Sequence, residues 1–221
     1  MLRIVLISAL MFRPTVAYAD DPPYVPSPQG FVESSTLVPA LKEQALIGQP
    51  EGKRVIGVYL LPAEVSALMH GTSRGLSIYC RAYVIRESAT EEDAKTFFQS
   101  AVASMKRSYA QPFDPNSPET KQMLRPYINY AEKKGLSLGV AGLTNLGSIM
   151  ETSDVLAGAA IGELSTETGP ISVNSAFALI RDGKDVLELT VGAQFEDQDS
   201  ITRADNVLKN WVKALGLSPS R

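Results

Sequence analysis

A ten-residue stretch, 76–85, alternates in polarity and constrains the fold more than any other part of the chain. Successive side chains of a β-strand point to opposite faces of its sheet. One face of this strand would carry Leu76, Ile78, Cys80, Ala82 and Val84. The other face would carry Ser77, Tyr79, Arg81, Tyr83 and Ile85. The stretch therefore predicts a strand with an apolar face and an amphipathic face.

A long amphipathic helix is predicted directly after this strand. Thr90 and Asp93 have the spacing of a capping box, and two glutamates favour the positive end of a helix dipole. Apolar residues follow at helical spacing as far as Tyr109.

A second long helix is predicted near the C-terminus. Asp199-Ser200 would cap it, and an apolar stripe over 201–215 ends at Gly216. Trp211 lies centrally in this stripe, so we expect it to be buried against a sheet, near Phe195 or Phe177.

Shorter elements fill the first half of the chain. The pattern predicts a helix over 37–47 and a buried strand over 55–61. It also predicts a short helix over 63–70, with Pro62 as the proline of its first turn. Ser117-Pro118 could start another helix, which Pro126 should kink or restart. From 136 to 162 the chain is rich in Gly, Ala and Leu, and helix and strand stay open alternatives.

A β-hairpin is predicted around Gly183. Apolar residues alternate over 171–179 and again over 187–195. Leu179 opposite Leu187 would place both apolar sets on one face, with a three-residue loop, 182–184.

These elements predict an α+β fold in the order αβαβα, then β-hairpins and a C-terminal helix. A single, mostly antiparallel sheet would carry the two long amphipathic helices that begin at Thr90 and Ser200. Residues 20–36, with four prolines before Gly30, would form an extended lead-in that serves as a flexible tether or docking segment. Residues 37–217 would form one domain.

The N-terminus has the pattern of a signal peptide over residues 1–19. Arg3 precedes a largely apolar run of nine residues, 4–12, and Ala17-Tyr18-Ala19 is a small-x-small triplet that predicts cleavage after Ala19. The apolar run is too short to span a bilayer core of about 30 Å as a helix. We therefore expect a periplasmic or secreted protein with no membrane span after cleavage.

Charge and cysteine content narrow the possible partners. Without the two arginines of the predicted signal peptide, the formal net charge of −3 would fall to about −5, which gives no reason to expect nucleic acid as a partner. Cys80 is the single cysteine, and we expect it to be buried as a small hydrophobic residue. Pairing with another molecule is the alternative.

Several motifs resemble catalytic or metal sites, but each has the wrong context. The stretch 71–75 matches G-x-S-x-G, yet it would connect a helix to a strand, and the single histidine, His70, precedes Ser73. The stretch 48–54 is too short for a phosphate-binding loop. The acidic stretch 196–199 lacks the glycine and later glutamate of a calcium loop. We therefore expect no cofactor, no metal site and no catalytic residue.

The best candidates for ligand or partner binding are Tyr79, Arg81 and Tyr83. On one strand face they would stand about 7 Å apart, so the guanidinium could lie between the two phenols. On an open face they would form a recognition surface, whereas beneath a helix they would pack. The sequence favours the packed alternative, because most sheet faces of such domains are covered.

The sequence predicts an exported, non-catalytic envelope protein that binds a partner protein or a small ligand. The alternative is a periplasmic hydrolase that uses a pair of carboxylates about 5–9 Å apart. The oligomeric state stays open.

Overall fold

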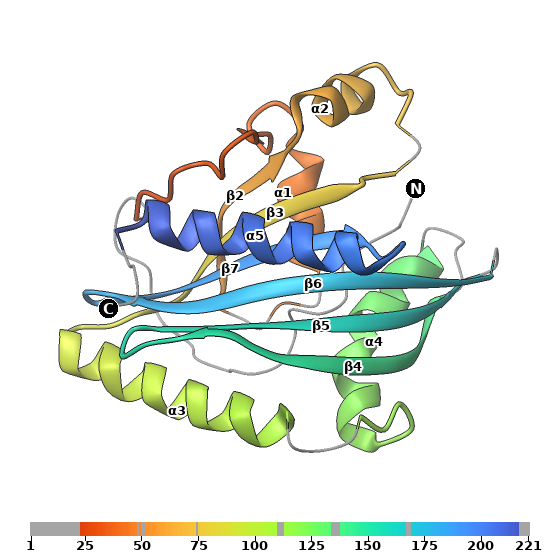
Figure 1. The fold of residues 1–221 in the computed structure, drawn as a ribbon. Helices are drawn as coiled ribbons and strands as arrows, with labels where there is room; N and C mark the ends of the chain where they lie inside the picture. Colours follow the sequence, from red (N-terminus) through yellow and green to blue (C-terminus); the bar gives the residue numbers. More distant parts are fainter. Residues whose placement is uncertain are drawn as a thin grey trace.

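The computed structural model of the chain describes residues 23–47, 49, 52–73, 75–109, 113–133, 138–166 and 169–216. The predicted signal peptide lies outside these residues. The elements in chain order are β1 (Val32–Glu33), α1 (Ala40–Ala45), β2 (Arg54–Leu60), α2 (Pro62–Met69), β3 (Ile78–Glu87), α3 (Glu91–Tyr109), α4 (Pro118–Lys133), β4 (Leu138–Glu151), β5 (Val155–Thr166), β6 (Gly169–Asp182), β7 (Asp185–Gln194) and α5 (Gln198–Ala214) (Figure 1).

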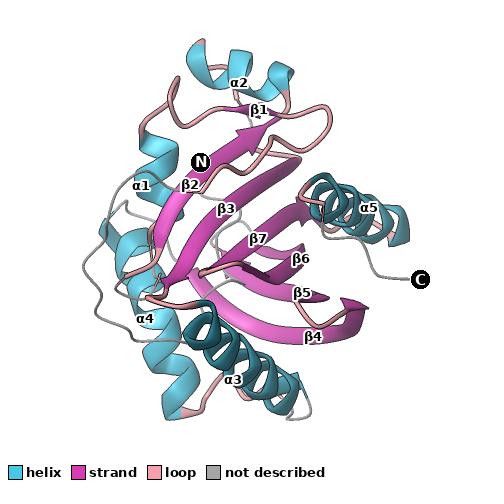
Figure 2. Ribbon diagram, turned by 90° about the vertical axis from the view of Figure 1, so that its left-hand side faces the viewer, coloured by secondary structure: helices cyan, strands magenta, loops and turns pink. Residues whose placement is uncertain are grey.

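The strands form one seven-stranded sheet in the order β1-β2-β3-β7-β6-β5-β4, and every neighbouring pair is antiparallel. In Figure 2, α5 lies on one side of the sheet, and α1, α3 and α4 lie on the other. A mixed α+β fold with a single antiparallel sheet is thus confirmed.

The prediction of two long helices on the sheet is confirmed only in part. α5 packs along β6 and β7, while α3 touches the same two strands less extensively. A third long helix, α4, packs against β4. α4 contains Pro126 and is continuous around it, so of the two predicted alternatives the restart is wrong and the kink stays a prediction.

Both faces of the sheet are buried, which the strand composition explains. The core beneath α5 includes Cys80, Leu189 and Trp211, and the core on the other face includes Tyr83 and Val186. Cys80 is buried as predicted. A strand covered on both sides needs apolar residues on both faces.

The predicted faces of β3 are confirmed within the strand itself. Ile78, Cys80 and Ala82 face the α5 core, and Tyr79 and Tyr83 face the other core. Leu76 was predicted to share a face with Ile78 and Cys80, but it packs against the other core. It precedes the first residue of β3, so strand alternation does not apply to it.

The predicted register of the β6–β7 hairpin is wrong by one residue. Leu179 pairs with Glu188, and Asp182 pairs with Asp185, which leaves a two-residue loop. Gly183 adopts a φ of +57° there, as two-residue hairpin turns favour. Both strands are buried on both faces, so apolar residues of β6 meet those of β7 in either register.

The 136–162 region, where helix and strand were open alternatives, forms β4 and most of β5. α2 starts at Pro62 and α3 follows the Thr90 cap, as predicted. Thr90 Oγ1 accepts a hydrogen bond of 3.1 Å from the Asp93 backbone N–H. α1 is shorter than the predicted 37–47 helix, because Pro39 occupies its N-cap position.

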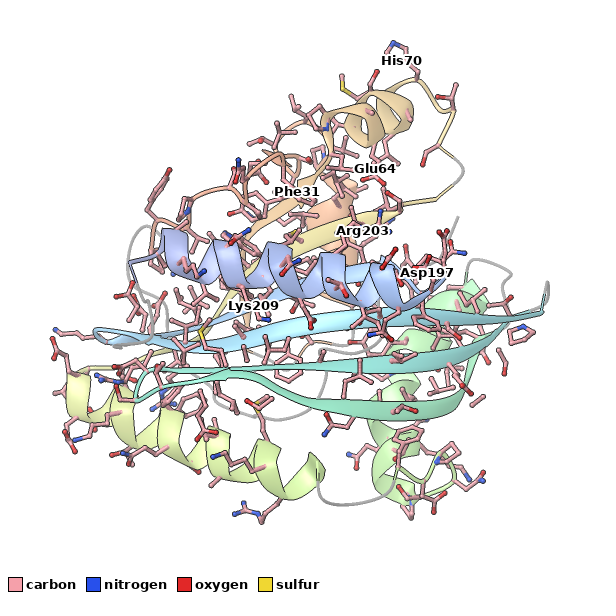
Figure 3. All side chains as sticks on the ribbon, in the orientation of Figure 1. Phe31, Glu64, His70, Asp197, Arg203 and Lys209 are labelled. Carbon is pink, nitrogen blue, oxygen red and sulfur yellow. The ribbon has the colours of Figure 1, made fainter. Side chains whose placement is uncertain are left out.

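The start of α5 differs from the prediction. Its N-cap is Asp197, whose carboxylate accepts a 2.9 Å hydrogen bond from the Ser200 backbone N–H. The predicted cap, Asp199-Ser200, instead lies within the first helical turn. Figure 3 shows Asp197 at this end of α5.

Trp211 is buried as predicted, but its aromatic neighbour is different. Its ring packs edge-on against Tyr59 of β2, with ring centroids 5.2 Å apart. Phe195 and Phe177 are not part of the core that contains Trp211. Trp211 is near the end of α5, where β2 and the N-terminal segment meet the helix.

Candidate functional site

The three predicted binding residues lie in a row on β3 and are buried. Tyr79, Arg81 and Tyr83 are 4%, 5% and 0% exposed. They face away from α5, towards the side of the sheet that carries α1, α3 and α4 (Figure 2). The packed arrangement is therefore the observed one, and the binding role of the three residues stays a prediction.

The guanidinium of Arg81 contacts both phenols. Its central carbon lies 4.5 Å from the centroid of the Tyr79 ring, and Nη1 donates a long hydrogen bond of 3.5 Å to Tyr83 Oη. Tyr83 in turn donates a 3.0 Å hydrogen bond to the backbone carbonyl of Ala45 in α1. This row of side chains connects the middle of the sheet to α1.

β7 supplies the neighbours of this row. Tyr79 pairs with Gly192, and Tyr83 pairs with Glu188. A Cβ atom at Gly192 would overlap the Tyr79 ring, so the absent side chain leaves room for the ring to lie on β7. Gly192 therefore helps to fix the position of the Tyr79 ring, which contacts the Arg81 guanidinium.

Sequence reasoning missed a lysine and a glutamate in the same cluster. Lys53 donates 2.7 Å hydrogen bonds to Glu188 and to Gln49, and its ammonium lies 4.1 Å from the centroid of the Tyr83 ring. Gln49 also donates to Tyr127 Oη of α4, at 3.3 Å. The buried polar cluster is defined as Lys53, Tyr79, Arg81, Tyr83, Tyr127 and Glu188.

The burial of this cluster controls its protonation. Desolvation lowers the pKa of Lys53, although Glu188 opposes the shift. Burial raises the pKa of Tyr83 to about 12 and also raises the pKa of Tyr127. Burial alone would lower the pKa of Arg81, but Tyr83 and Tyr79 hold it above its usual value. At neutral pH the phenols stay protonated, and Tyr83 donates its hydrogen bond to the Ala45 carbonyl.

A second cluster involves the N-terminal segment, residues 23–31, which we call the strap. In Figure 1 the strap is drawn in red and starts beside the C-terminal end of α5. The indole Nε1–H of Trp211 donates a 2.6 Å hydrogen bond to the Pro26 carbonyl. Tyr59 Oη donates a 3.2 Å hydrogen bond to the carbonyl of Val25. The aromatic pair, Tyr59 and Trp211, therefore holds two successive main-chain carbonyls of the strap.

The lead-in of residues 20–36 was predicted to be a flexible tether or a docking segment. Its residues 23–31 pack on the rest of this molecule, and a role towards a partner stays a prediction. Val25 and Phe31 belong to the α5 core, while Tyr24 is 86% exposed. A Cβ atom at Gly57 would lie 2.9 Å from the Tyr59 ring, so this glycine lets the ring lie along β2. The prolines of 22–28 and the single tryptophan are visible in the sequence. Because they lie far apart along the chain, no local pattern predicts that they are in contact.

The remaining motifs have structural roles where they are described. His70 is the C-cap residue of α2, its Nδ1 lies 2.8 Å from the Ser66 carbonyl, and Figure 3 shows it at the outer end of the molecule. Ser73 Oγ bonds within its own turn, to Gly75. Three residues of the 48–54 stretch, Gly48, Pro50 and Glu51, lie outside the described residues.

The predicted alternative, a hydrolase with a pair of carboxylates, directs attention to the acidic residues at the β6–β7 hairpin. Glu87 pairs across strands with Asp185, which also pairs with Asp182. Burial raises the pKa of Asp185, and the two neighbouring carboxylates add to the effect. Arg54 forms an ion pair with Glu87. This arrangement closes the hairpin end of the sheet.

Within the described part of the chain, no group of three or more His, Cys, Asp or Glu side chains is placed to hold a metal ion. None of the helices described has the length and apolar character that a membrane span requires.

Comparison of the whole chain with protein-family models, with curated proteins and with solved structures found no match.

Proposed function

We propose that this chain is an exported, non-catalytic protein, periplasmic or secreted, that binds a partner protein or a ligand. The observation that carries the proposal is the contact between the aromatic pair and the strap. Tyr59 and Trp211 direct both of their polar groups at main-chain carbonyls of a proline-rich segment that forms no helix or strand over 23–28. Main-chain recognition by aromatic side chains is a recurring mode of protein–protein binding.

The signal-peptide pattern of residues 1–19 supports export. The buried polar cluster has a structural role, because its hydrogen bonds join structural elements to one another. Lys53 and Glu188 join β7 to the residue before β2, and Tyr83 joins β3 to α1. A ligand of Tyr79, Arg81 and Tyr83 would need α1 or α4 to move.

The alternative function, a carboxylate-dependent hydrolase, has one supporting observation. Asp185 has a raised pKa beside Glu87, as an acid catalyst requires. Arg54 neutralises Glu87, and the pair stands at a hairpin end. The binding function therefore accounts for more of the structure than the hydrolase does.

Export and binding can be tested together in the native cells. We expect the tagged chain outside the cytoplasm, with a mature N-terminus at Asp20. A partner captured with it should capture the chain in return, and the two purified proteins should bind each other directly. The variant Lys42→Met should bind equally well, because Lys42 is an exposed residue of α1 and belongs to neither cluster.

Unprocessed chain in the cytoplasm would contradict the export half of the proposal. Robust turnover of an envelope substrate by the purified chain, lost in Asp185→Asn and retained in Lys42→Met, would favour the hydrolase.

A further inference from the structure

We propose that the aromatic pair is a docking site for an extended, proline-rich segment of a partner protein, and that the strap occupies this site as a built-in competitor. The inference rests on the proposed binding function and names the partner chemistry and its regulation. The strap itself shows which chemistry the site accepts.

The site offers hydrogen-bond donors. The indole of Trp211 can only donate, and the hydroxyl of Tyr59 donates here. Both donors meet carbonyls at neighbouring residues, Val25 and Pro26. Proline has a carbonyl and no backbone N–H, so a proline-rich segment supplies acceptors without burying an unpaired donor. Its backbone is also already extended, which lowers the entropic cost of docking.

The geometry of the pair is fixed by the fold. Trp211 and Tyr59 are 1% and 2% exposed and meet at an interplanar angle of 78°. Gly57 gives the Tyr59 ring its place on β2, and α5 fixes the indole. β2 and α5 therefore position the two rings, and the strap covers them.

The strap is held by few polar contacts. Among the described residues, the two hydrogen bonds from the aromatic pair join the carbonyls of 25 and 26 to the rest of the molecule. Residues 23–28 form no helix or strand. Apolar anchoring comes from Val25 and Phe31, while Ser27 is exposed. Because the strap is tethered, its effective concentration at the site is of the order of millimolar, and a partner segment must compete with it.

The test uses Trp211 as a reporter, because it is the single tryptophan of the chain. The chain from Asp20 to Arg221 is compared with Val25→Asp, which places a charge at a buried strap position, and with Ser27→Asp, the matched change at an exposed strap position. The probe is a synthetic peptide with the sequence of residues 22–31. A second peptide has alanine in place of each proline.

We expect Val25→Asp to shift the Trp211 emission to longer wavelength and Ser27→Asp to leave it unchanged. The proline peptide should reverse the shift and bind Val25→Asp at least about tenfold more tightly than the wild type, where the strap competes. The alanine peptide should bind at least about tenfold more weakly, because its added N–H groups have no acceptor. If Val25→Asp does not fold, Val25→Ala weakens the apolar anchor of the strap, leaves Tyr59 and Trp211 in place, and should give the same changes in smaller size.

An unchanged emission in folded Val25→Asp, or no peptide effect at millimolar concentration, would overturn the proposal. Wild-type dimers that the peptide dissociates would identify a second copy of this chain as the occupant, which also overturns it. A partner that binds the wild type and Val25→Asp equally and ignores the peptide would leave the binding function standing and refute only this site.

Discussion

The two faces of the sheet are both buried, but they are built from different side chains. β3 contributes Cys80 and Ala82 to the α5 face, and Tyr79, Arg81 and Tyr83 to the face that carries α1, α3 and α4. The α5 face is covered by one long helix and the strap, which meet at Trp211. The opposite face is covered by three helices, with charges and phenols between them and the sheet.

The difference teaches how each face is specified. Apolar packing on the α5 face is non-directional, so its helix is positioned mainly by the shape and area of buried side chains. On the opposite face, a buried cation is costly unless hydrogen bonds satisfy it, so Lys53 and Glu188 demand one arrangement. Mutations should therefore act through lost packing on the first face and through unpaired charge on the second.

The largest expected effect comes from removing the indole on the α5 face. Trp211→Ala should lower the free energy of unfolding by roughly 3–5 kcal/mol, the range for deleting a large core aromatic. Trp211→Phe is the matched variant, because it keeps a ring beside Tyr59 and loses the hydrogen bond to Pro26. It should cost less than Trp211→Ala. Urea denaturation followed by circular dichroism measures both, and an unchanged midpoint for Trp211→Ala would mean that packing does not hold this face.

On the opposite face, Lys53→Met should cost roughly 3 kcal/mol, because it leaves the Glu188 carboxylate partly buried without its ammonium partner. Methionine places an uncharged side chain of similar length beside the Tyr83 ring. Combining Lys53→Met with Glu188→Leu should recover much of the loss, as removal of both charges does in other buried pairs. The exposed control Lys42→Met should stay within about 0.5 kcal/mol of wild type.

Simple additivity of Lys53→Met and Glu188→Leu in urea denaturation would show that the two charges do not depend on each other. The contrast between the two faces would then disappear.

Alkaline pH should destabilise the protein through the phenols of the polar face. Tyrosine ionises near pH 10 in an unfolded chain, whereas burial raises the pKa of Tyr83 to about 12. Between these values the folded chain keeps a proton that the unfolded chain loses, so stability falls as pH rises, by up to about 1.4 kcal/mol per pH unit for each such group. Lys53 acts oppositely, since its lowered pKa makes stability rise with pH, but this contribution ends near pH 10.4.

Tyr83→Phe should therefore flatten the fall in unfolding free energy between pH 10 and 11.5, measured by urea denaturation at each pH. Tyr24→Phe changes an exposed tyrosine and should leave the slope as in wild type. An equal slope in wild type and Tyr83→Phe would contradict the buried, protonated phenol.

Local chemistry made much of the fold predictable from sequence. The Thr90–Asp93 cap, Pro62 at the start of α2 and the alternation within β3 each depend on residues a few positions apart. The register of β6 against β7 was not predictable in the same way. Apolar residues occur at even positions such as Ile180 and at odd ones such as Leu179, and the core on each face takes one of the two sets.

The clusters depend on contacts between distant segments, and this limits what sequence can show. Lys53 and Glu188 are 135 positions apart, and Pro26 and Trp211 are 185 apart. The alternation of β3 did predict that Arg81 would lie between two phenols. It could not predict that Glu188 and Lys53 join them, because the register of β7 and of the residues around the start of β2 against β3 was unknown.

The smallest expected effect compares two aspartates at the start of α5. Asp197→Ala should cost about 1 kcal/mol, because the carboxylate accepts the Ser200 N–H that would otherwise lack a partner in the first turn. Asp199→Ala, at the position that the sequence suggested as the cap, should change the unfolding free energy by no more than about 0.5 kcal/mol. Thr90→Ala provides the same test for α3 on the opposite face, and a cost similar to that of Asp197→Ala is expected. A larger effect for Asp199→Ala than for Asp197→Ala in urea denaturation would contradict Asp197 as the N-cap. It would instead place the start of α5, the helix that carries Trp211, at the position that the sequence suggested.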